Sequence, residues 1–101
     1  MKPPLSNETA AAMLAALGST TRLFIFKTLI RAGDPGINVS TLRHRVGMPA
    51  STLGHHLSLL VEAGLVAQTR VGRELICTVR FETVRSLGTY LMSECCTETS
   101  S

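Results

Sequence analysis

The sequence is poor in aromatic residues: among its 101 residues it has no tryptophan, one tyrosine and three phenylalanines. Hydrophobic residues nevertheless make up 45% of the chain, so its core must be aliphatic. A chain of this length is near the lower limit for a domain that folds alone, and small aliphatic domains are often stabilised as two-fold dimers. We therefore predict one domain, residues 1–101, that is stabilised further by dimerisation.

Long hydrophobic runs are missing as well. The longest apolar stretch, residues 10–17, ends at Gly18 and is too short to span a bilayer. The opening segment, MKPPLSNETA, lacks the apolar part of a secretory signal. Three cysteines, two of them adjacent, do not form a disulfide framework. These absences predict a reduced, cytoplasmic protein without a membrane-spanning segment.

Catalytic motifs are also absent. The sequence shows no set of base, nucleophile and oxyanion-binding groups and no phosphate-binding loop, so we do not expect an enzyme. Positive charge is instead concentrated in the middle of the chain. The net charge is +3, and residues 40–73 contain four arginines against the single acid Glu62: Arg43, Arg45, Arg70 and Arg73. This pattern is typical of a surface for an anionic partner such as nucleic acid, although an ordinary solvated basic face has the same charge.

The spacing of apolar residues predicts five helices. They are expected at residues 8–17, 20–33, 39–46, 50–64 and 81–93. Ser19 and Asn38 are suited to cap the start of the second and third helices, and Gly64 the end of the fourth. In the second helix, the predicted buried face consists of Leu23, Phe24, Phe26, Thr28 and Ile30. In the fourth, it consists of Leu53, Leu57, Leu60 and Val61.

After the fourth helix the apolar period changes from 3.6 to 2. Residues 65–80 read as two strands joined by a tight turn, with Arg70 and Arg73 near its tip. The alternation puts Cys77 on the apolar face of the second strand, so we expect this thiol to act as a small buried hydrophobic group. The predicted architecture is mainly α with a β-hairpin wing (α+β). Four helices, two strands and a last helix form a winged helix-turn-helix.

Residues 38–64 have the pattern of a helix-turn-helix: a short helix, a tight turn at Gly47 and a second helix from about Ala50. Hydroxyls and imidazoles on the outward face of the second helix can contact base edges and phosphates, and nearby arginines can contact phosphates. The predicted DNA-contacting residues are Arg43, Ser51, Thr52, Gly54, His55, His56, Arg70 and Arg73. A glycine within a helix costs about 1 kcal/mol relative to alanine, and either close approach of DNA or simple tolerance accounts for Gly54.

Two stretches, ALGSTTRLFIFKTLI and VSTLRHRVGMPASTLGHHLSLLVEAGLVAQTRVGRELICTVR, resemble the ArsR/SmtB family of metalloregulatory repressors. The resemblance covers about Leu14 to Arg80. It implies a homodimer whose interface is formed by the first and last helices, residues 6–18 and 81–95. It also implies a repressor that binds double-stranded operator DNA of two-fold character and releases it when an inducer binds.

Members of this family hold their inducers at different places. A Cys-x-Cys site near the start of the third helix is absent here, because that segment reads NVSTLRHRV. A zinc site of Asp and His along the last helix is absent too, because that helix reads FETVRSLGTYLMSE, so zinc is not expected. What remains is the adjacent pair Cys95 and Cys96, at the junction with the tail of residues 96–101. This pair resembles the cysteines with which some arsenic-responsive members bind trivalent arsenic.

Thiol chemistry agrees with that resemblance. Soft thiolates favour soft centres such as trivalent arsenic or antimonite. A disulfide between neighbours is unfavourable, because adjacent Cα atoms are about 3.8 Å apart and disulfides need about 4.4–6.8 Å. Arsenite commonly takes three sulfur ligands, and the third is left open because Cys77 is expected to be buried; methylarsenite needs only two.

We therefore expect that arsenite or methylarsenite, bound to Cys95 and Cys96, releases the operator. Two alternatives stay open. The first is a thiol redox or persulfide switch that uses Cys77 together with this pair. The second is a winged-helix transcription factor that responds to no small molecule.

Overall fold

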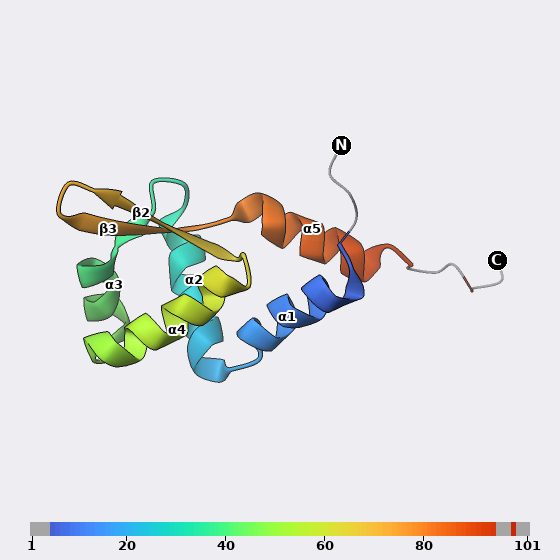
Figure 1. Ribbon diagram of the computed structural model, residues 1–101, viewed down its shortest axis with the longest axis horizontal. Coiled ribbons are helices and arrows are strands. Elements are labelled where there is room, and N and C mark those ends of the chain that lie inside the picture. The colour runs from blue at the N-terminus through green and yellow to red at the C-terminus, as the bar shows by residue number, and fades with distance from the viewer. Residues whose placement is uncertain (1–4, 95–97, 99–101) are drawn as a thin grey trace.

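The computed structural model describes residues 5–94 and Glu98, so Cys95 and Cys96, the predicted arsenic ligands, lie outside the described residues. In chain order the elements are α1 (Asn7–Leu17), α2 (Thr20–Ala32), β1 (Ile37–Asn38), α3 (Val39–Val46), α4 (Ala50–Glu62), β2 (Val66–Val71), β3 (Glu74–Val79) and α5 (Phe81–Met92). Figure 1 shows α2, α3 and α4 gathered around the sheet, while α1 and α5 extend toward the other end of the molecule. The predicted winged helix-turn-helix architecture is confirmed.

Side-chain caps explain where α2 and α3 begin. The Ser19 hydroxyl accepts a hydrogen bond from the backbone N–H of Arg22 at 3.2 Å. Asn38 Oδ1 accepts one from the backbone N–H of Thr41 at 2.7 Å. Both predicted caps are confirmed. A cap of this kind stabilises a helix by about 1 kcal/mol, because it satisfies one of the N–H groups that have no partner within the helix.

The chain leaves α4 through Gly64, as predicted. Gly64 has a φ of 79°, a left-handed conformation that glycine adopts without strain. Its N–H donates to the carbonyl oxygen of Val61 at 2.9 Å, and the N–H of Leu65 donates to that of Leu60 at 3.1 Å. These two bonds satisfy carbonyls at the end of the helix and turn the chain directly into β2.

The sheet has three strands, one more than the predicted hairpin. β2 and β3 pair antiparallel along their whole lengths and form the expected wing. β1 lies on the other side of β3, with Ile37 opposite Cys77 and Asn38 opposite Ile76. A two-residue strand has no periodicity of its own, which is why the apolar pattern did not predict it.

Gly36 allows β1 to approach β3 this closely. Its φ is 77°, and a Cβ atom built at this position would lie 2.5 Å from Thr78 Cγ2 and 2.6 Å from the carbonyl oxygen of Cys77. The second of these atoms belongs to the backbone and cannot rotate away. Glycine is therefore required twice over at this position, for its conformation and for its lack of a side chain.

The core is mainly aliphatic, as the composition predicts, with Phe26 as its buried aromatic residue among those that the structure describes. The largest fully buried side chains are Ile25, Leu29, Leu42, Leu53, Leu57, Leu60, Leu65, Val66 and Cys77. The predicted buried face of α4 is therefore confirmed for its three leucines, while Val61 is half-buried. From α5, Leu87 enters the core and Tyr90 packs against its edge. The core thus holds the helix-turn-helix and the wing together and extends along α1 and α5.

The predicted buried face of α2 is partly wrong. Phe26 and Thr28 are buried, but Leu23, Phe24 and Ile30 are 43%, 47% and 39% exposed. Ile25 and Leu29 take their places in the core. Apolar residues occur on every side of this helix, so periodicity alone could not select a face. The selection comes from packing against α1, α3 and β3, and the last of these is distant from α2 in sequence.

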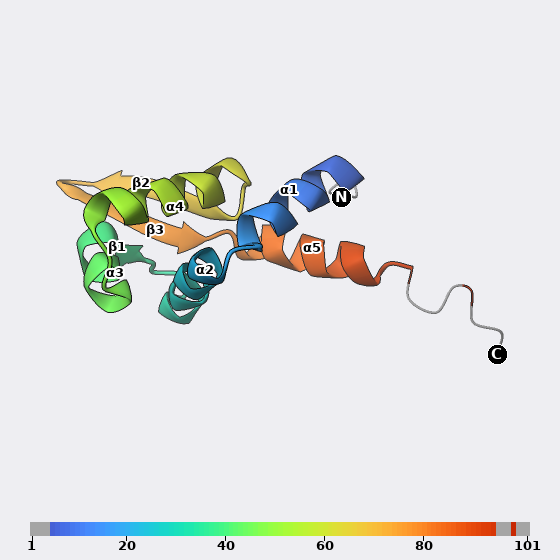
Figure 2. The same cartoon turned by 90° about the horizontal axis from the view of Figure 1, so that it is seen from below.

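Helices α1 and α5 lie against each other at the end of the molecule away from the wing, as both views show (Figures 1 and 2). Among the described residues, no single helix is long and apolar enough to cross a membrane. By length and composition only, α1 and α2 pass that test together, as a pair bent by 96°.

Candidate nucleic-acid interface

The helix-turn-helix is built from α3, a turn and α4. The backbone N–H of Gly47 donates to the carbonyl oxygen of Arg43 at 2.9 Å and ends α3. Leu42 on α3 and Leu53 on α4 are both fully buried, so the two helices are anchored in the same core. The opposite face of α4 is therefore exposed to solvent along the N-terminal half of the helix.

The start of α4 carries the first group of predicted contacts. Pro49 occupies the N-cap position, and no side chain caps this end of the helix. N–H groups in the first turn of a helix carry partial positive charge and bind phosphate oxygens readily. Ser51 and Thr52 are exposed in the same turn. The start of α4 therefore presents two hydroxyls beside the positive N-terminus of the helix, which suits contact with a phosphate backbone.

Gly54 and His55 follow on the exposed face of α4. A Cβ atom added at Gly54 would meet no other atom within 4 Å. Packing within the chain therefore gives no reason for a glycine here. The helix backbone at this point is bare, and a ligand can approach it more closely than it could approach any other residue type.

The basic side chains of the wing lie at the same end of the molecule as the start of α4. Arg70 and Arg73 are exposed beside the β2–β3 turn, and Arg43 is exposed on α3. Both views show the turn of the wing and the α3–α4 region together, far from the C-terminal end of α5 (Figures 1 and 2). The structure thus brings the predicted arginines and the exposed face of α4 to one end of the protein.

Asn38 connects the wing to α3, a role that the sequence did not reveal. Its Oδ1 caps α3, while its Nδ2 donates to Glu74 Oε1 at 3.3 Å. Glu74 begins β3 and follows Arg73 directly. The side-chain amide of Asn38 therefore links the start of α3 to Glu74, the residue at which β3 leaves the turn of the wing.

His56 differs from the other predicted contacts because it is half-buried at the edge of α4 that faces α2. Its Nδ1 lies 3.4 Å from Nη1 of Arg22, and Nε of Arg22 donates to the carbonyl oxygen of Ala16 at 2.7 Å. Burial, the Arg22 guanidinium and the His55 ring all lower the pKa of His56 below its ordinary value. Sequence reasoning missed Arg22, although the residue lies in the TTRL segment that carries the family resemblance.

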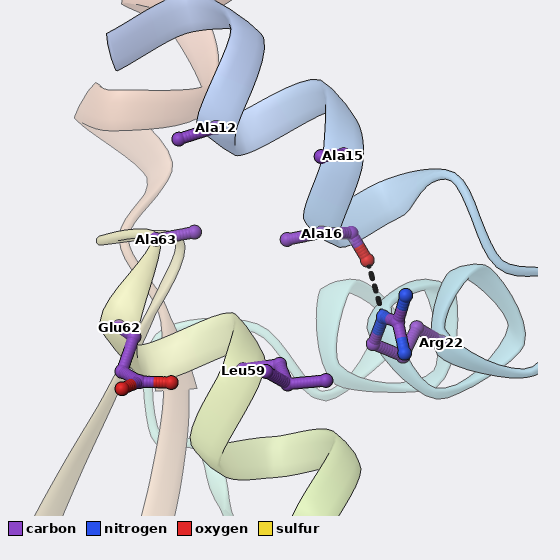
Figure 3. A pocket seen from close by; sticks show the side chains of 7 residues that line it. All are labelled: Ala12, Ala15, Ala16, Arg22, Leu59, Glu62 and Ala63. Atoms are coloured by element: carbon purple, nitrogen blue, oxygen red, sulfur yellow. Dashed lines mark hydrogen bonds between the residues drawn. The ribbon is translucent and has the colours of Figure 1, made fainter. Parts of the chain in front are cut away.

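A shallow cavity of about 420 Å³ separates α1 from α4 beside this arginine. Figure 3 shows the alanines of α1 facing Leu59 and Glu62 of α4 across the cavity, with the bond from Arg22 to Ala16 at one side. Its lining residues are Ala12, Ala15, Ala16, Arg22, Leu59, Glu62 and Ala63. Small side chains thus leave the space between α1 and α4 unfilled here, and Arg22 bridges the two helices through Ala16 and His56.

Cys77 is fully buried in β3, as predicted. Gln68 Nε2 donates to its sulfur at 3.5 Å. Burial raises the pKa of the Cys77 thiol, and the hydrogen bond from Gln68 offsets part of that increase. In residues 5–94 and Glu98, no three His, Cys, Asp or Glu side chains are grouped so that they could hold a metal ion.

Comparison with known proteins gives consistent matches. A helix-turn-helix domain model matches residues 5–69. The transcriptional regulator YgaV of Escherichia coli is 30% identical over 82 residues, which are 81% of this chain and 81% of YgaV. The crystal structure of NolR from Sinorhizobium fredii has a TM-score of 0.67 at 27% identity, covering 93% of this chain and 97% of NolR. An ArsR-like regulator from Rhodococcus has a TM-score of 0.74 at 24% identity, covering 90% and 82%.

Proposed function

Because this chain belongs to the ArsR/SmtB family of winged helix-turn-helix transcriptional regulators, we propose that it is a homodimeric repressor whose operator is released when trivalent arsenic binds Cys95 and Cys96. Membership of the family makes the protein a DNA-binding transcriptional regulator and not an enzyme. The homodimer, the repression and the inducer are the proposal, and each has its own support.

The homodimer is supported by apolar side chains left on the surface of α1 and α5. Leu14 on α1 and Leu91 and Met92 on α5 are 43%, 55% and 63% exposed. Large apolar side chains grouped on two neighbouring helices favour burial against a second copy. A two-fold dimer also presents two copies of α4, which fits a DNA site with two half-sites about one helical turn apart.

Recognition through α4 predicts opposite effects of one substitution on stability and on DNA binding. Gly54→Ala should raise the free energy of unfolding by about 1 kcal/mol, because alanine is the better helix former and the added methyl group meets nothing. The same methyl group should weaken operator binding, because it stands between the helix backbone and the DNA. Urea unfolding and fluorescence anisotropy with labelled operator DNA measure the two effects.

Thr21→Ala is the matched control for Gly54→Ala. Thr21 is exposed on α2, so the change improves helix propensity away from the interface and should leave operator affinity unchanged. A Gly54→Ala protein that is stabilised and binds operator as well as wild type would show that DNA does not approach this part of α4.

The inducer is proposed from the cysteine pair, the single observation that carries this part of the function. Cys95 and Cys96 follow α5 after two residues, and that helix ends at Met92. Two adjacent thiols suit a thiophilic centre, since trivalent arsenic displaces the thiol protons when it binds. For release to follow, arsenic must bind the low-affinity state of the dimer more tightly than the DNA-bound state, and such couplings are typically about 1–3 kcal/mol.

A thiol redox or persulfide switch that uses Cys77 with the pair has less support. Cys77 is fully buried, and burial raises the pKa of its thiol. The thiolate is the form that attacks a disulfide or an oxidised sulfur, and access to the sulfur is required as well. Cys77 lacks both properties in this fold, so a site confined to Cys95 and Cys96 is preferred.

Operator binding titrated with arsenite, methylarsenite, antimonite, zinc and cadmium tests the inducer. We expect an arsenic species to weaken binding about 5–150-fold, the range that couplings of this size allow. The double substitution Cys95→Ser/Cys96→Ser should abolish the effect while leaving operator affinity without arsenic unchanged. Cys77→Ala is the matched control and should keep the full response. If the double variant still responds to arsenic, or if Cys77→Ala does not, the assignment of the site is wrong.

A further inference from the structure

We propose that Arg22 is a positioning residue for DNA recognition: its guanidinium holds the ring of His56 in the tautomer that carries the proton on Nε2, and ties α4 to the last turn of α1. The inference rests on DNA binding through α4 and not on the arsenic site. It concerns a side chain on α2, which lies on neither α4 nor the wing.

Hydrogen bonds fix Arg22 both at its backbone and at the tip of its side chain. Arg22 lies in the first turn of α2, where its backbone N–H donates to the Ser19 hydroxyl. At the other end of its side chain, Nε donates to the carbonyl oxygen of Ala16 at 2.7 Å. That carbonyl belongs to the last turn of α1, where carbonyls have no partner within the helix. The fork geometry of the guanidinium then directs Nη1 toward His56 (3.4 Å from its Nδ1).

The tautomer follows from the chemistry of the two groups. A guanidinium donates hydrogen bonds and cannot accept them, so Nδ1 of His56 must be the acceptor in this contact. A neutral imidazole has one donor and one acceptor, which leaves the proton on Nε2. The ring therefore offers an N–H donor to a phosphate or to a base acceptor. Without Arg22 the proton would exchange between the two nitrogens, and the ring would be free to turn.

The charges around the ring favour its neutral form. Burial, the guanidinium of Arg22 on α2 and the ring of His55 on α4 all lower the pKa of His56. As the pH falls, the unfolded chain therefore takes up a proton before the folded His56 does. The free energy of unfolding should decrease as the pH falls below about 6.5, the ordinary value, and the loss is complete below the lowered pKa. A proton on Nδ1 would also point at the guanidinium and break the contact.

Nitrogen-15 NMR of the histidine rings tests the proposal directly in the free wild-type protein. We expect His56 to be neutral at pH 7.5 with its proton on Nε2. In Arg22→Gln the pKa of His56 should rise toward its ordinary value, and the spectrum should show a mixture of tautomers. The ring signals of His44, on α3, should be the same in the variant as in the wild-type protein. A wild-type ring with the proton on Nδ1 would overturn the proposal, and this measurement needs no variant to fold.

Operator binding by a double-mutant cycle separates positioning from general support of the fold. We expect Arg22→Gln to weaken binding about tenfold, equivalent to about 1.4 kcal/mol. In a His56→Ala background the same substitution should cost less than about twofold, because the ring that it orients is gone.

Arg22→Lys keeps the charge but cannot make both contacts, so it should also lose affinity. Arg31→Gln, on the opposite exposed face of α2, is the matched control and should bind like wild type. If the losses of operator affinity caused by Arg22→Gln and His56→Ala were fully additive, Arg22 would support the fold without orienting His56.

Discussion

Gly36→Ala is expected to lower the free energy of unfolding by about 2–5 kcal/mol, a large part of the total stability of a domain of this size. Two costs combine. A left-handed backbone conformation costs a residue with a Cβ about 1–2 kcal/mol, and forcing an extra atom into packed structure costs about 1–3 kcal/mol. Gly36 has a φ of 77°, and the added Cβ would lie 2.6 Å from a backbone carbonyl oxygen of β3. Urea unfolding followed by circular dichroism measures the loss.

Gly72→Ala separates the two costs. Gly72, in the turn of the wing, has a φ of 62° and nothing within 4 Å of an added Cβ. This variant should therefore lose only about 1–2 kcal/mol, the conformational part. If both glycine variants lost the same amount, the close approach of β1 to β3 would not exist in solution. A loss of β1 pairing should also appear as faster hydrogen exchange at Cys77, which lies opposite Ile37.

The second large effect is expected from Leu91→Glu. This substitution should convert the proposed dimer to a monomer and weaken operator binding at least about 100-fold. Leu91 is 55% exposed on α5, and a two-fold interface receives the introduced charge from both copies. Burying a carboxylate without a partner costs several kcal/mol, so association should be lost while the fold is kept. Binding to two half-sites then loses the gain in affinity that comes from linking two copies of α4.

Sedimentation equilibrium and operator anisotropy measure the effects of Leu91→Glu. Phe24→Glu is its matched control, since Phe24 is an apolar side chain of similar exposure, 47%, on the outer face of α2. We expect the control protein to remain dimeric. The reverse result, a monomer from Phe24→Glu and a dimer from Leu91→Glu, would move the interface from α1 and α5 to α2.

Local signals in the sequence predicted the helix limits well. The capping bonds of Ser19, Asn38 and Gly64 each join residues three positions apart, so these roles can be predicted from neighbouring residues in the sequence. The change of the apolar period from 3.6 to 2 after Gly64 likewise predicted the wing. Together these local patterns predicted the order of the helices and of the two wing strands.

Contacts between distant segments could not be predicted in this way. The contact of Arg22 with His56 joins positions 34 residues apart, and nothing in the spacing of either segment points to the other. The buried face of α2 depended in the same way on which neighbours the fold brought to it. His56 was therefore predicted as an outward DNA contact, although its ring is half-buried against α2.

The scarcity of aromatic residues has a practical consequence for spectroscopy. Tyr90 is the single tyrosine of a chain without tryptophan, so the intrinsic fluorescence excited at wavelengths that phenylalanine does not absorb comes from one ring. That ring is half-buried on α5, one residue before Leu91. Its emission, and its dichroism at wavelengths longer than those that phenylalanine absorbs, should thus report the proposed association of two copies, and any rearrangement of α5 that an inducer causes, with no dye attached.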